Sequence, residues 1–391
     1  MNRHIENWNN TNLGSLLKNK KQKGHHEEEL LSVTRENGII RRDSLERRDT
    51  SNKDKGKYLL VDKGDIAYNT MRMWQGVSGV SSYRGIVSPA YTVCSTTEKI
   101  DSKFASYLLK DPAMILLFKQ RSQGLVSDTW NLKYEKFSQI PCSLPPLFEQ
   151  KKIAEILSGI DNLISKKRDL NKKNNLLLKA FIDELMEGDE NWERVFLSKI
   201  LLFKNGLNTS KENFGVGTPF VSYKNVYAGG LIKEEDLTEC VSLTPSEEDR
   251  FCLKRGDILF TRTSETPDEI GFNAVYNTSV PAVFNGFCIR GRPLNDSLLV
   301  PEFSSFYFRS NAVLSQMRSL SKYTTRAGIS AESLGKVQIM IPPINVQKKI
   351  ANSLSSIKKL IKSVDKSIHS LQHLKQSISQ DLLSGTRRVT V

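Results

Sequence analysis

One 44-residue segment occurs twice in this chain. Residues 145–188 and 342–385 align without a gap at an offset of 197 residues, and 15 of the 44 positions are identical. Each copy begins with a Pro-Pro pair, contains the string Gln-Lys-Lys-Ile-Ala and ends at a glycine. A longer and less similar segment precedes each copy, so the duplication predicts a chain with two pseudo-equivalent halves.

The repeated segment is predicted to be a long α-helix. A proline pair favours a helix that begins directly after it, and Gly188 and Gly385 suit a helix end that requires a positive φ. Apolar residues recur every seven positions, which indicates a coiled-coil seam. In the second copy the two stripes are Ile350, Ile357, Val364, Leu371 and Ile378, and Leu354, Ile361, Ile368 and Leu382. In the first copy the stripes are Ile153, Ile160 and Phe181, and Leu157, Ile164, Leu178 and Leu185, with Lys167, Asn171 and Asn174 interrupting the middle.

A helix of about 38 residues is roughly 55 Å long and has to bury its apolar stripe. We expect the two copies to pack against each other as an antiparallel coiled coil that acts as a spacer. The alternative is a helical hairpin inside a globular core. Roughly 150 residues separate the copies, whereas such hairpins have short loops, so the spacer is the better interpretation.

The two larger segments also resemble each other. Glu6-Asn7-Trp8 corresponds to Glu190-Asn191-Trp192, and Gly64-Asp65-Ile66 to Gly256-Asp257-Ile258. Alternating apolar runs predict strands at 65–68, 257–260 and 282–289, and helical runs are expected at 103–120 and 302–320. We therefore predict an α+β chain with a pseudo-twofold internal repeat, in which two α/β domains are joined by two long antiparallel coiled-coil helices. The expected boundaries are 1–141 and 189–338 for the domains and 142–188 and 339–391 for the helical segments.

The composition indicates an anionic partner. The formal net charge is +14 and the pI is about 9.4, which is typical of proteins that bind nucleic acid. The basic excess lies in 1–144 and 342–391, whereas 189–341 is close to neutral. No run of eighteen apolar residues and no leader-like N-terminus occurs, so we expect no membrane association. Five cysteines without a Cys-x-x-Cys spacing indicate reduced thiols and a cytoplasmic protein.

No motif for catalysis is present. The sequence has no Gly-x-x-x-x-Gly-Lys-Ser/Thr loop, no Gly-x-Gly-x-x-Gly, no Gly-x-Ser-x-Gly and no Asn/Asp-Pro-Pro-Tyr/Phe motif of an amino-methyltransferase. His369 and His373 are four residues apart on a predicted helix but lack further ligands at suitable spacing, so solvent exposure is the better interpretation. We expect neither a catalytic centre nor a metal site, which indicates a binding subunit.

The chain resembles the specificity (S) subunits of type I restriction-modification systems over nearly its whole length. The resemblance is strongest in LPPLFEQKKIAEIL from Leu144 and IPPINVQKKIANSL from Ile341. The first string matches the family pattern Pro-Pro-Leu-x-Glu-Gln-x-x-Ile in full. The second copy departs from it, with Ile344 and Val346 where Leu and Glu are usual. The repeated Trp-x4-Leu and Gly-Asp-Ile strings fit as well.

The resemblance implies that each large segment is a target recognition domain that reads one half of a bipartite double-stranded DNA sequence, while the helices fix the gap. Two methyltransferase (M) subunits would bind the chain and methylate adenine, and restriction (R) subunits would add translocation and cleavage. S-adenosylmethionine, ATP and Mg²⁺ would be bound by those partners, and this chain would need no cofactor.

Base reading requires polar side chains at loop tips. In the first half the candidates are Thr34, Arg35, Asn37, Asn69, Thr70, Arg72, Trp74, Arg121 and Gln123. In the second half they are Ser222, Tyr223, Lys224, Asn225, Thr261, Arg262, Thr263, Ser264, Lys322, Tyr323, Thr324 and Arg326.

Two other functions remain open at this point. A self-sufficient DNA methyltransferase or nuclease would require the cofactor loop that the sequence lacks. A coiled-coil scaffold would bind partners but not DNA.

Overall fold

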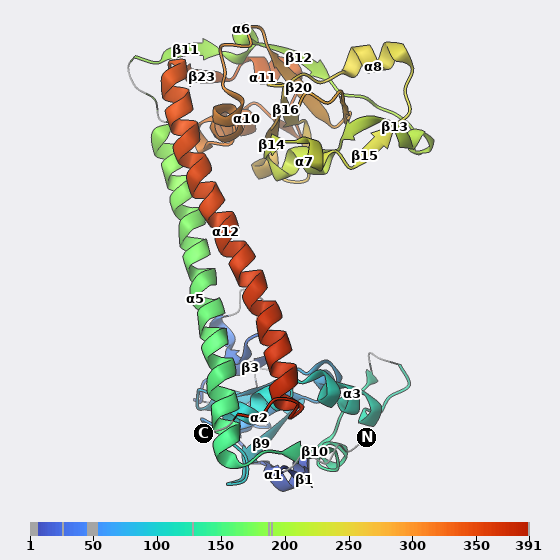
Figure 1. Ribbon diagram of the computed structural model, residues 1–391, viewed down its shortest axis with the longest axis vertical. Helices are drawn as coiled ribbons and strands as arrows, with labels where there is room; N and C mark the ends of the chain where they lie inside the picture. The colour runs from blue at the N-terminus through green and yellow to red at the C-terminus, as the bar shows by residue number, and fades with distance from the viewer. Residues whose placement is uncertain are drawn as a thin grey trace. The chain divides into compact units, whose positions relative to one another are not determined.

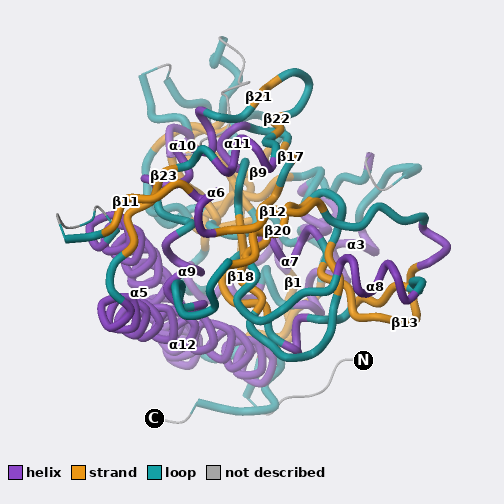
Figure 2. The backbone as a smooth tube through the Cα atoms, turned by 90° about the horizontal axis from the view of Figure 1, so that it is seen from above, coloured by secondary structure: helices purple, strands orange, loops and turns teal. Residues whose placement is uncertain are grey.

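A computed structural model describes residues 7–25, 27–44, 54–126, 129–186, 188 and 191–389. The chain divides into two compact units (Figure 1). Figure 2 shows the helices, strands and loops of the same backbone in separate colours. Unit 1 comprises Met1–Lys167 and Ser367–Val391, and unit 2 comprises Arg168–Lys366. Each long helix therefore contributes one end to each unit.

Unit 1 is built on antiparallel strands. Its largest sheet has the order β2 (Leu17–Asn19), β9 (Tyr91–Thr96), β6 (Ile66–Asn69) and β7 (Ser78–Val80). Three strand pairs accompany it: β1 (Asn9–Asn12) with β10 (Pro141–Leu144), β3 (Leu31–Thr34) with β4 (Gly38–Arg41), and β5 (Leu59–Val61) with β8 (Gly85–Val87). The short helices are α1 (Leu13–Leu16), α2 (Ser102–Leu108), α3 (Pro112–Arg121), α4 (Tyr134–Phe137) and the 3-10 turns η1 (Arg42–Ser44) and η2 (Met73–Gln75).

Unit 2 has a larger, mixed sheet with the order β12 (Leu201–Asn205), β20 (Cys288–Pro293), β16 (Ile258–Thr261), β18 (Asn273–Tyr276) and β14 (Gly230–Ile232). Smaller sheets are β15 (Glu239–Val241), β13 (Phe214–Val221) and β19 (Val283–Phe284); β17 (Thr263–Ser264), β22 (Ala327–Gly328) and β21 (Lys322–Tyr323); and β11 (Glu193–Phe196) with β23 (Gln338–Ile341). The helices are α6 (Leu197–Ile200), α7 (Tyr223–Ala228), α8 (Pro245–Phe251), α9 (Pro301–Tyr307), α10 (Asn311–Ser319) and α11 (Ala331–Gly335), with 3-10 turns η4 (Lys211–Asn213), η5 (Glu234–Asp236) and η6 (Pro267–Glu269).

The repeated segments form the two long helices, as predicted. Helix α5 spans Leu147–Leu185 and helix α12 spans Ile344–Leu383, and each begins directly after its Pro-Pro pair. Gly188 and Gly385 have positive φ values of 93° and 71°, which confirms the expected helix ends.

The helices pair antiparallel within each unit. In unit 1, Lys375 Nζ lies 2.6 Å from Asp161 Oδ1, and in unit 2, Asn171 Nδ2 donates a hydrogen bond to Asp365 Oδ1. Both pairs have residue numbers that sum to 536, so the two units share one helical register. The polar Asn171 interrupts the seam where the sequence indicated.

The apolar stripes pack as the seven-residue spacing predicts, with one exception. Ile164 of α5 and Ile361, Val364 and Ile368 of α12 are buried. Phe181 is 41% exposed, so its assignment to the seam was wrong. Ile182 packs against the unit 2 core instead, because a straight helix of 3.6 residues per turn drifts from a seven-residue repeat.

The helix ends are part of the domain cores. In unit 1, Ile153, Leu157 and Leu382 belong to the same buried cluster as Phe104 and Phe137. In unit 2, Ile350, Leu354 and Met186 lie in one cluster with Phe303 and Phe308. Each unit thus folds around the start of one long helix and the end of the other.

The glutamine of the repeated Gln-Lys-Lys-Ile-Ala string makes the same three hydrogen bonds in both units. Gln150 accepts from Asp101 N (2.9 Å) and donates to Lys99 O and Pro145 O. Gln347 accepts from Val300 N (2.8 Å) and donates to Leu298 O and Pro342 O. Both side chains are buried, so each satisfies backbone groups at the start of α2 or α9 and fastens the long helix to its domain.

The glutamate before Gln150 has a different partner. Arg388 forms a bidentate ion pair with Glu149, with both N–O distances 2.8 Å, and Val389 N also donates to this carboxylate. Burial opposes the charged form, but the Arg388 and Val389 hydrogen bonds outweigh it and lower the pKa of Glu149. The second copy has Val346 at this position, so the interaction exists in unit 1 alone among the described residues.

Two predicted helices and one predicted strand are divided in the structure. The 103–120 run forms α2 and α3, because Asp111 caps α3 and Pro112 takes its first position. The 302–320 run likewise forms α9 and α10, which begins after Ser310. The 282–289 run forms β19 and the start of β20, separated by a turn in which Asn285 Oδ1 accepts from Phe287 N.

Gln347→Leu should destabilise unit 2 by about 1–3 kcal/mol, because it leaves Val300 N–H and two carbonyls buried without partners. Urea unfolding followed by circular dichroism measures this loss. Lys349→Leu is the matched control, since Lys349 is exposed on the same helix turn. Equal stability of the two variants would contradict the fastening role of Gln347.

Candidate nucleic-acid interface

Unit 2 brings three of the predicted loops together. Tyr223 Oη at the start of α7 donates to Thr263 O (3.1 Å). Strand β17 pairs with β22 in the register Thr263 with Gly328 and Ser264 with Ala327, and β21 pairs with the same strand. The residues around Ser222, Thr261 and Lys322 thus form one cluster, although they are 40 to 100 residues apart in sequence.

These loops surround a groove of about 340 Å³. Its aromatic lining comes from Tyr223, Tyr227 and Phe287. Its polar lining consists of Thr263, Ser264, Glu265, Glu269 and Arg326. A groove with flat aromatic surfaces, an arginine and carboxylates can contact base edges through both donors and acceptors.

Hydrogen bonds hold the lining side chains in place. The Glu269 carboxylate accepts from Tyr227 Oη (2.7 Å) and from Ser264 Oγ (3.2 Å). The bond to Glu269 raises the pKa of Tyr227 above its ordinary value, and burial raises the pKa of Tyr223. Both phenols therefore stay protonated at neutral pH and keep donating to Thr263 O and to Glu269.

The groove suits bases better than phosphates. Carboxylates accept hydrogen bonds from the amino groups of cytosine or adenine, and arginine donates two to guanine. Glu265 and Glu269 would repel a phosphate at the same place. The nearly neutral charge of residues 189–341 agrees with this local mixture of signs.

Several predicted contact residues are used inside the domain. Thr261 is fully buried and its hydroxyl donates to Glu269 O. Ser222 and Asn225 form the capping box of α7, and Asn225 also donates to Asp236 O. The polar atoms of these three residues shape the loops, and their contact with bases stays a prediction. The exposed candidates in unit 2 are Lys224, Lys322, Tyr323, Thr324 and Arg326, with Arg262 and Thr263 partly exposed.

Unit 1 joins two of its three predicted loops. Trp74, in the loop after β6, contacts Trp130 edge-to-face at 5.3 Å between ring centroids. Leu132 N donates to Thr70 O, and Lys119 Nζ lies 5.7 Å from the Trp130 ring. Gln123 and Asn131 form a β-bridge at the base of this loop. Arg72, Arg121 and Gln123 are exposed. The unit 1 loops that correspond to the groove-lining loops of unit 2 thus carry an indole pair with Lys119 beside it.

Asn69 and Thr70 support this loop. Asn69 Oδ1 accepts from Met71 N, and Thr70 Oγ1 donates to Ala90 O. The third predicted loop of unit 1, with Thr34, Arg35 and Asn37, is the tight β3–β4 turn. The hydrogen bonds described for this turn are with Lys110, which lies between α2 and α3, and within the turn itself, not with the Trp74 loop. Lys110 Nζ donates to Arg35 O, and Thr34 Oγ1 donates to Gly38 O across the turn.

Five residues at these sites carry no sequence pattern that predicts them: Tyr227, Glu265, Glu269, Phe287 and Trp130. Tyr223 and Tyr227 are four residues apart and lie on one face of α7, a short helix that the sequence patterns did not predict. Recognising a helix there would have revealed the Tyr pair. A tryptophan within the polar sequence segment 122–131 was the available signal for Trp130.

No group of three or more histidine, cysteine or acidic residues suitable for a metal ion occurs in the described ranges. None of the described helices is long and apolar enough to cross a membrane. Cys94, Cys142 and Cys288 are buried free thiols, and burial raises the pKa of each to about 12, so they are not poised as nucleophiles.

A model of the family described as "Type I restriction modification DNA specificity domain" matches residues 5–175 and 189–373, one match for each half of the repeat. The chain belongs to this family. Members select the DNA sequence for type I restriction-modification enzymes and are not catalytic themselves, so the recognised resemblance is confirmed.

Individual relatives agree. The EcoKI specificity subunit of Escherichia coli (strain K12) is 25% identical over 279 residues, which are 66% of this chain and 59% of that protein. The chain thus spans less than two thirds of this relative. The MjaVIII specificity subunit of Methanocaldococcus jannaschii is 26% identical over 363 residues, covering 85% of this chain and 81% of the relative.

Solved structures share the fold. A chain from a study of complex assembly and conformational transition of the type I R-M system superposes with a TM-score of 0.64 at 15% identity, over 98% of this chain and 99% of that one. The S subunit from M. genitalium gives a TM-score of 0.55 at 16% identity, over 98% and 97%. The predicted fold class, two α/β domains with long antiparallel helices, is confirmed.

Arg326→Ala should weaken binding to the cognate DNA by about 1–3 kcal/mol and relax the sequence preference in one half-site only. Electrophoretic or anisotropy titration against a set of single-base variants measures both effects. Lys336→Ala is the control, because Lys336 is an exposed residue paired with Glu332 outside the groove. A uniform loss on every DNA sequence would instead make Arg326 a phosphate contact.

Proposed function

We propose that the unit 2 groove reads one half of a bipartite DNA target and that the Trp74–Trp130 cluster of unit 1 reads the other half. The observation that carries the proposal is the meeting of three separated polar loops at one groove with aromatic walls, an arginine and two carboxylates. The corresponding region of unit 1 has different side chains. Two related domains with different reading surfaces suit a target with two unlike halves.

The spacing between the half-sites would follow from the helices. Helices of 39 and 40 residues are about 60 Å long at 1.5 Å per residue. The common antiparallel register and the glutamine at each helix start support a spacer of fixed length. Half-sites about one to two helical turns apart are compatible with this length.

The partners would be two methyltransferase subunits, with restriction subunits joining the assembly. Exposed apolar residues on α5 support such docking: Ile156, Leu163, Leu176 and Leu177 are accessible, as expected for a surface that a partner covers. S-adenosylmethionine, ATP and Mg²⁺ would be bound by these partners. We infer that the assembly works in the cytoplasm, where the free thiols of this chain stay reduced.

Removing 165–171 and 365–371 together should shorten the preferred DNA gap by about 3 base pairs. The two deletions face each other in the observed register, preserve the heptad phase and shorten each helix by about 10 Å. Binding of the full chain, with its methyltransferase, to duplexes that differ only in gap length measures the change. The control is deletion of 165–171 alone, which breaks the register and should abolish the preference.

An unchanged optimal gap in the double deletion would contradict the spacer role. A coiled-coil scaffold without DNA recognition is the competing function. It predicts that the methyltransferase complex binds all of these duplexes equally, whatever their sequence or gap.

A further inference from the structure

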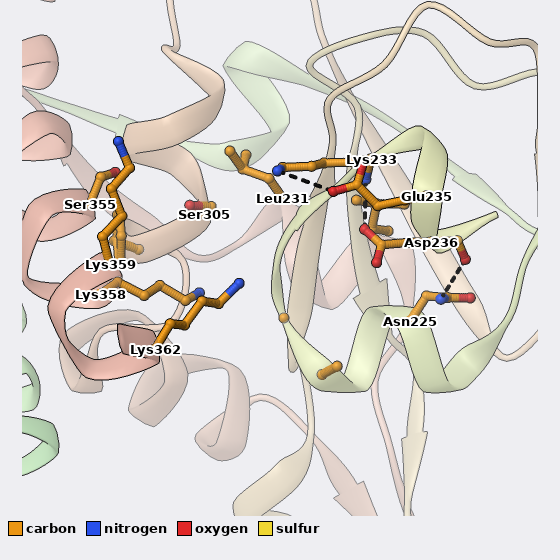
Figure 3. Close-up of a pocket in the computed structure, with 14 residues that line it drawn as sticks. Asn225, Leu231, Lys233, Glu235, Asp236, Ser305, Ser355, Lys358, Lys359 and Lys362 are labelled. Atoms are coloured by element: carbon orange, nitrogen blue, oxygen red, sulfur yellow. Dashed lines mark hydrogen bonds and ion pairs between the residues drawn. The ribbon is translucent and has the colours of Figure 1, made fainter. Parts of the chain in front are cut away.

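A second pocket in unit 2 lies on the opposite side of helix α7 from the unit 2 groove. It has a volume of about 360 Å³ and is bounded by α7, β14 and η5 on one side and by α12 on the other (Figure 3). Tyr223 and Tyr227 of α7 line the unit 2 groove, whereas Asn225, Ala228 and Gly229 line this pocket. The two hollows are thus separated by the width of one short helix.

Lysines dominate the α12 side of the pocket. Lys358, Lys359 and Lys362 all line it, and Figure 3 shows Lys358 and Lys362 extending from α12 into the gap. Lys358 is half-buried and lies 5.7 Å from the Phe306 ring centroid. Among the described residues, no carboxylate lies within 4.0 Å of the ammonium of these three lysines.

Two consecutive glycines make room for cations here. A Cβ at Gly230 would lie 2.9 Å from Lys358 Nζ, and a Cβ at Gly229 would lie 2.7 Å from Arg309 Nη2. Arg309 donates to Val226 O and Tyr227 O at the end of α7. Burial, with Lys362 and Arg309 nearby, lowers the pKa of Lys358. The pocket therefore concentrates positive charge on its α12 side.

The acidic residues on the opposite side have other partners. Glu235 Oε1 pairs with Lys233 Nζ (3.3 Å), and Asp236 Oδ2 accepts from Lys233 N (2.9 Å). Figure 3 shows both carboxylates grouped with Lys233, across the gap from the α12 lysines. An anion in the gap would lie against α12.

The repeat shows that this charge is particular to unit 2. At the 197-residue offset, Lys358 corresponds to Asp161, Lys359 to Asn162 and Lys362 to Ser165. Asp161 is neutralised by Lys375 (2.6 Å) and by a hydrogen bond from Tyr107 Oη (2.8 Å). At this place in the fold, unit 1 therefore has a carboxylate that is paired within the protein, whereas unit 2 has lysines.

We propose that Lys358 and Lys362, with Lys359 beside them, bind backbone phosphates of the DNA next to the half-site that unit 2 reads. This inference rests on the proposed function. An α-helix is about 10 Å across with its side chains, and the major groove is about 12 Å wide. If the base edges of a duplex contact the tyrosine side of α7, the phosphates at the edge of its major groove lie about as far away as the lysines on the opposite side of this helix. Lysine binds phosphate as a flexible point charge, so this contact is independent of sequence and acts at one end of the target only.

The test compares the full chain, with its methyltransferase, to the variant Lys358→Gln/Lys362→Gln. Affinity for the cognate duplex is measured by anisotropy from 50 to 300 mM KCl. The slope of log affinity against log salt should fall in magnitude by about 1–2, since each phosphate contact contributes about 0.9. The base preference at both half-sites should stay unchanged. Lys358→Arg/Lys362→Arg should keep the wild-type slope, and Lys348→Gln/Lys349→Gln, exposed near the start of α12, is the charge-matched control.

Neutral methylphosphonates placed one at a time along the duplex locate the contact. The wild-type protein should lose affinity at one or two positions beside the unit 2 half-site, and the glutamine variant should lose nothing further there. A wild-type salt slope in the glutamine variant would overturn the proposal, as would weakened methyltransferase binding with DNA binding intact, which would assign the pocket to a protein partner. Absence of sequence-specific binding by the wild-type protein would instead refute the proposed function.

Discussion

The apolar stripes of α5 and α12 have to be buried, and their pairing determines how both domains are built. Neither helix is stable alone at this length, because its stripe would face water. Pairing the repeat with itself solves this and brings the start of each helix to the end of the other. Gln150 and Gln347 then fix where each helix leaves its domain. A protein that reads two DNA segments at a set distance needs both features: a rod of defined length and a defined attachment at each end.

The two units share backbone positions and hydrogen bonds but differ in their charged side chains. Asp65 and Asp257 occupy equivalent buried positions, yet Lys20 neutralises the first (2.6 Å) and Arg292 the second (2.7 Å). Thr70 O and Arg262 O accept equivalent hydrogen bonds from Leu132 N and Ile329 N. The side chains on these loops differ completely, with indoles in unit 1 and phenols and carboxylates in unit 2. The backbone therefore presents loops at the same places, while the side chains that these loops carry differ between the units.

Sequence alone could predict what depends on period and repetition. The helix limits followed from the Pro-Pro pairs and terminal glycines, and the seam from seven-residue spacing. Loop identity was also predictable, since the residues near Tyr223, Thr263 and Arg326 do meet. Individual contacts were not, because Thr261 and Ser222 look like loop-tip donors and are used internally. Glu269 reaches the groove because it lies at the end of the 3-10 turn η6, and no local sequence pattern predicts this turn. The Lys358 pocket depends on glycines and cations from three separate elements.

Sequencing of methylated adenines across a genome that carries this protein with a methyltransferase partner shows which DNA sequence the assembly selects. One bipartite motif is expected, with two specified parts separated by an unspecified gap of constant length and with methylation in both parts. A single uninterrupted motif, or two parts whose separation varies freely, would contradict the proposed reading of two half-sites at a fixed spacing.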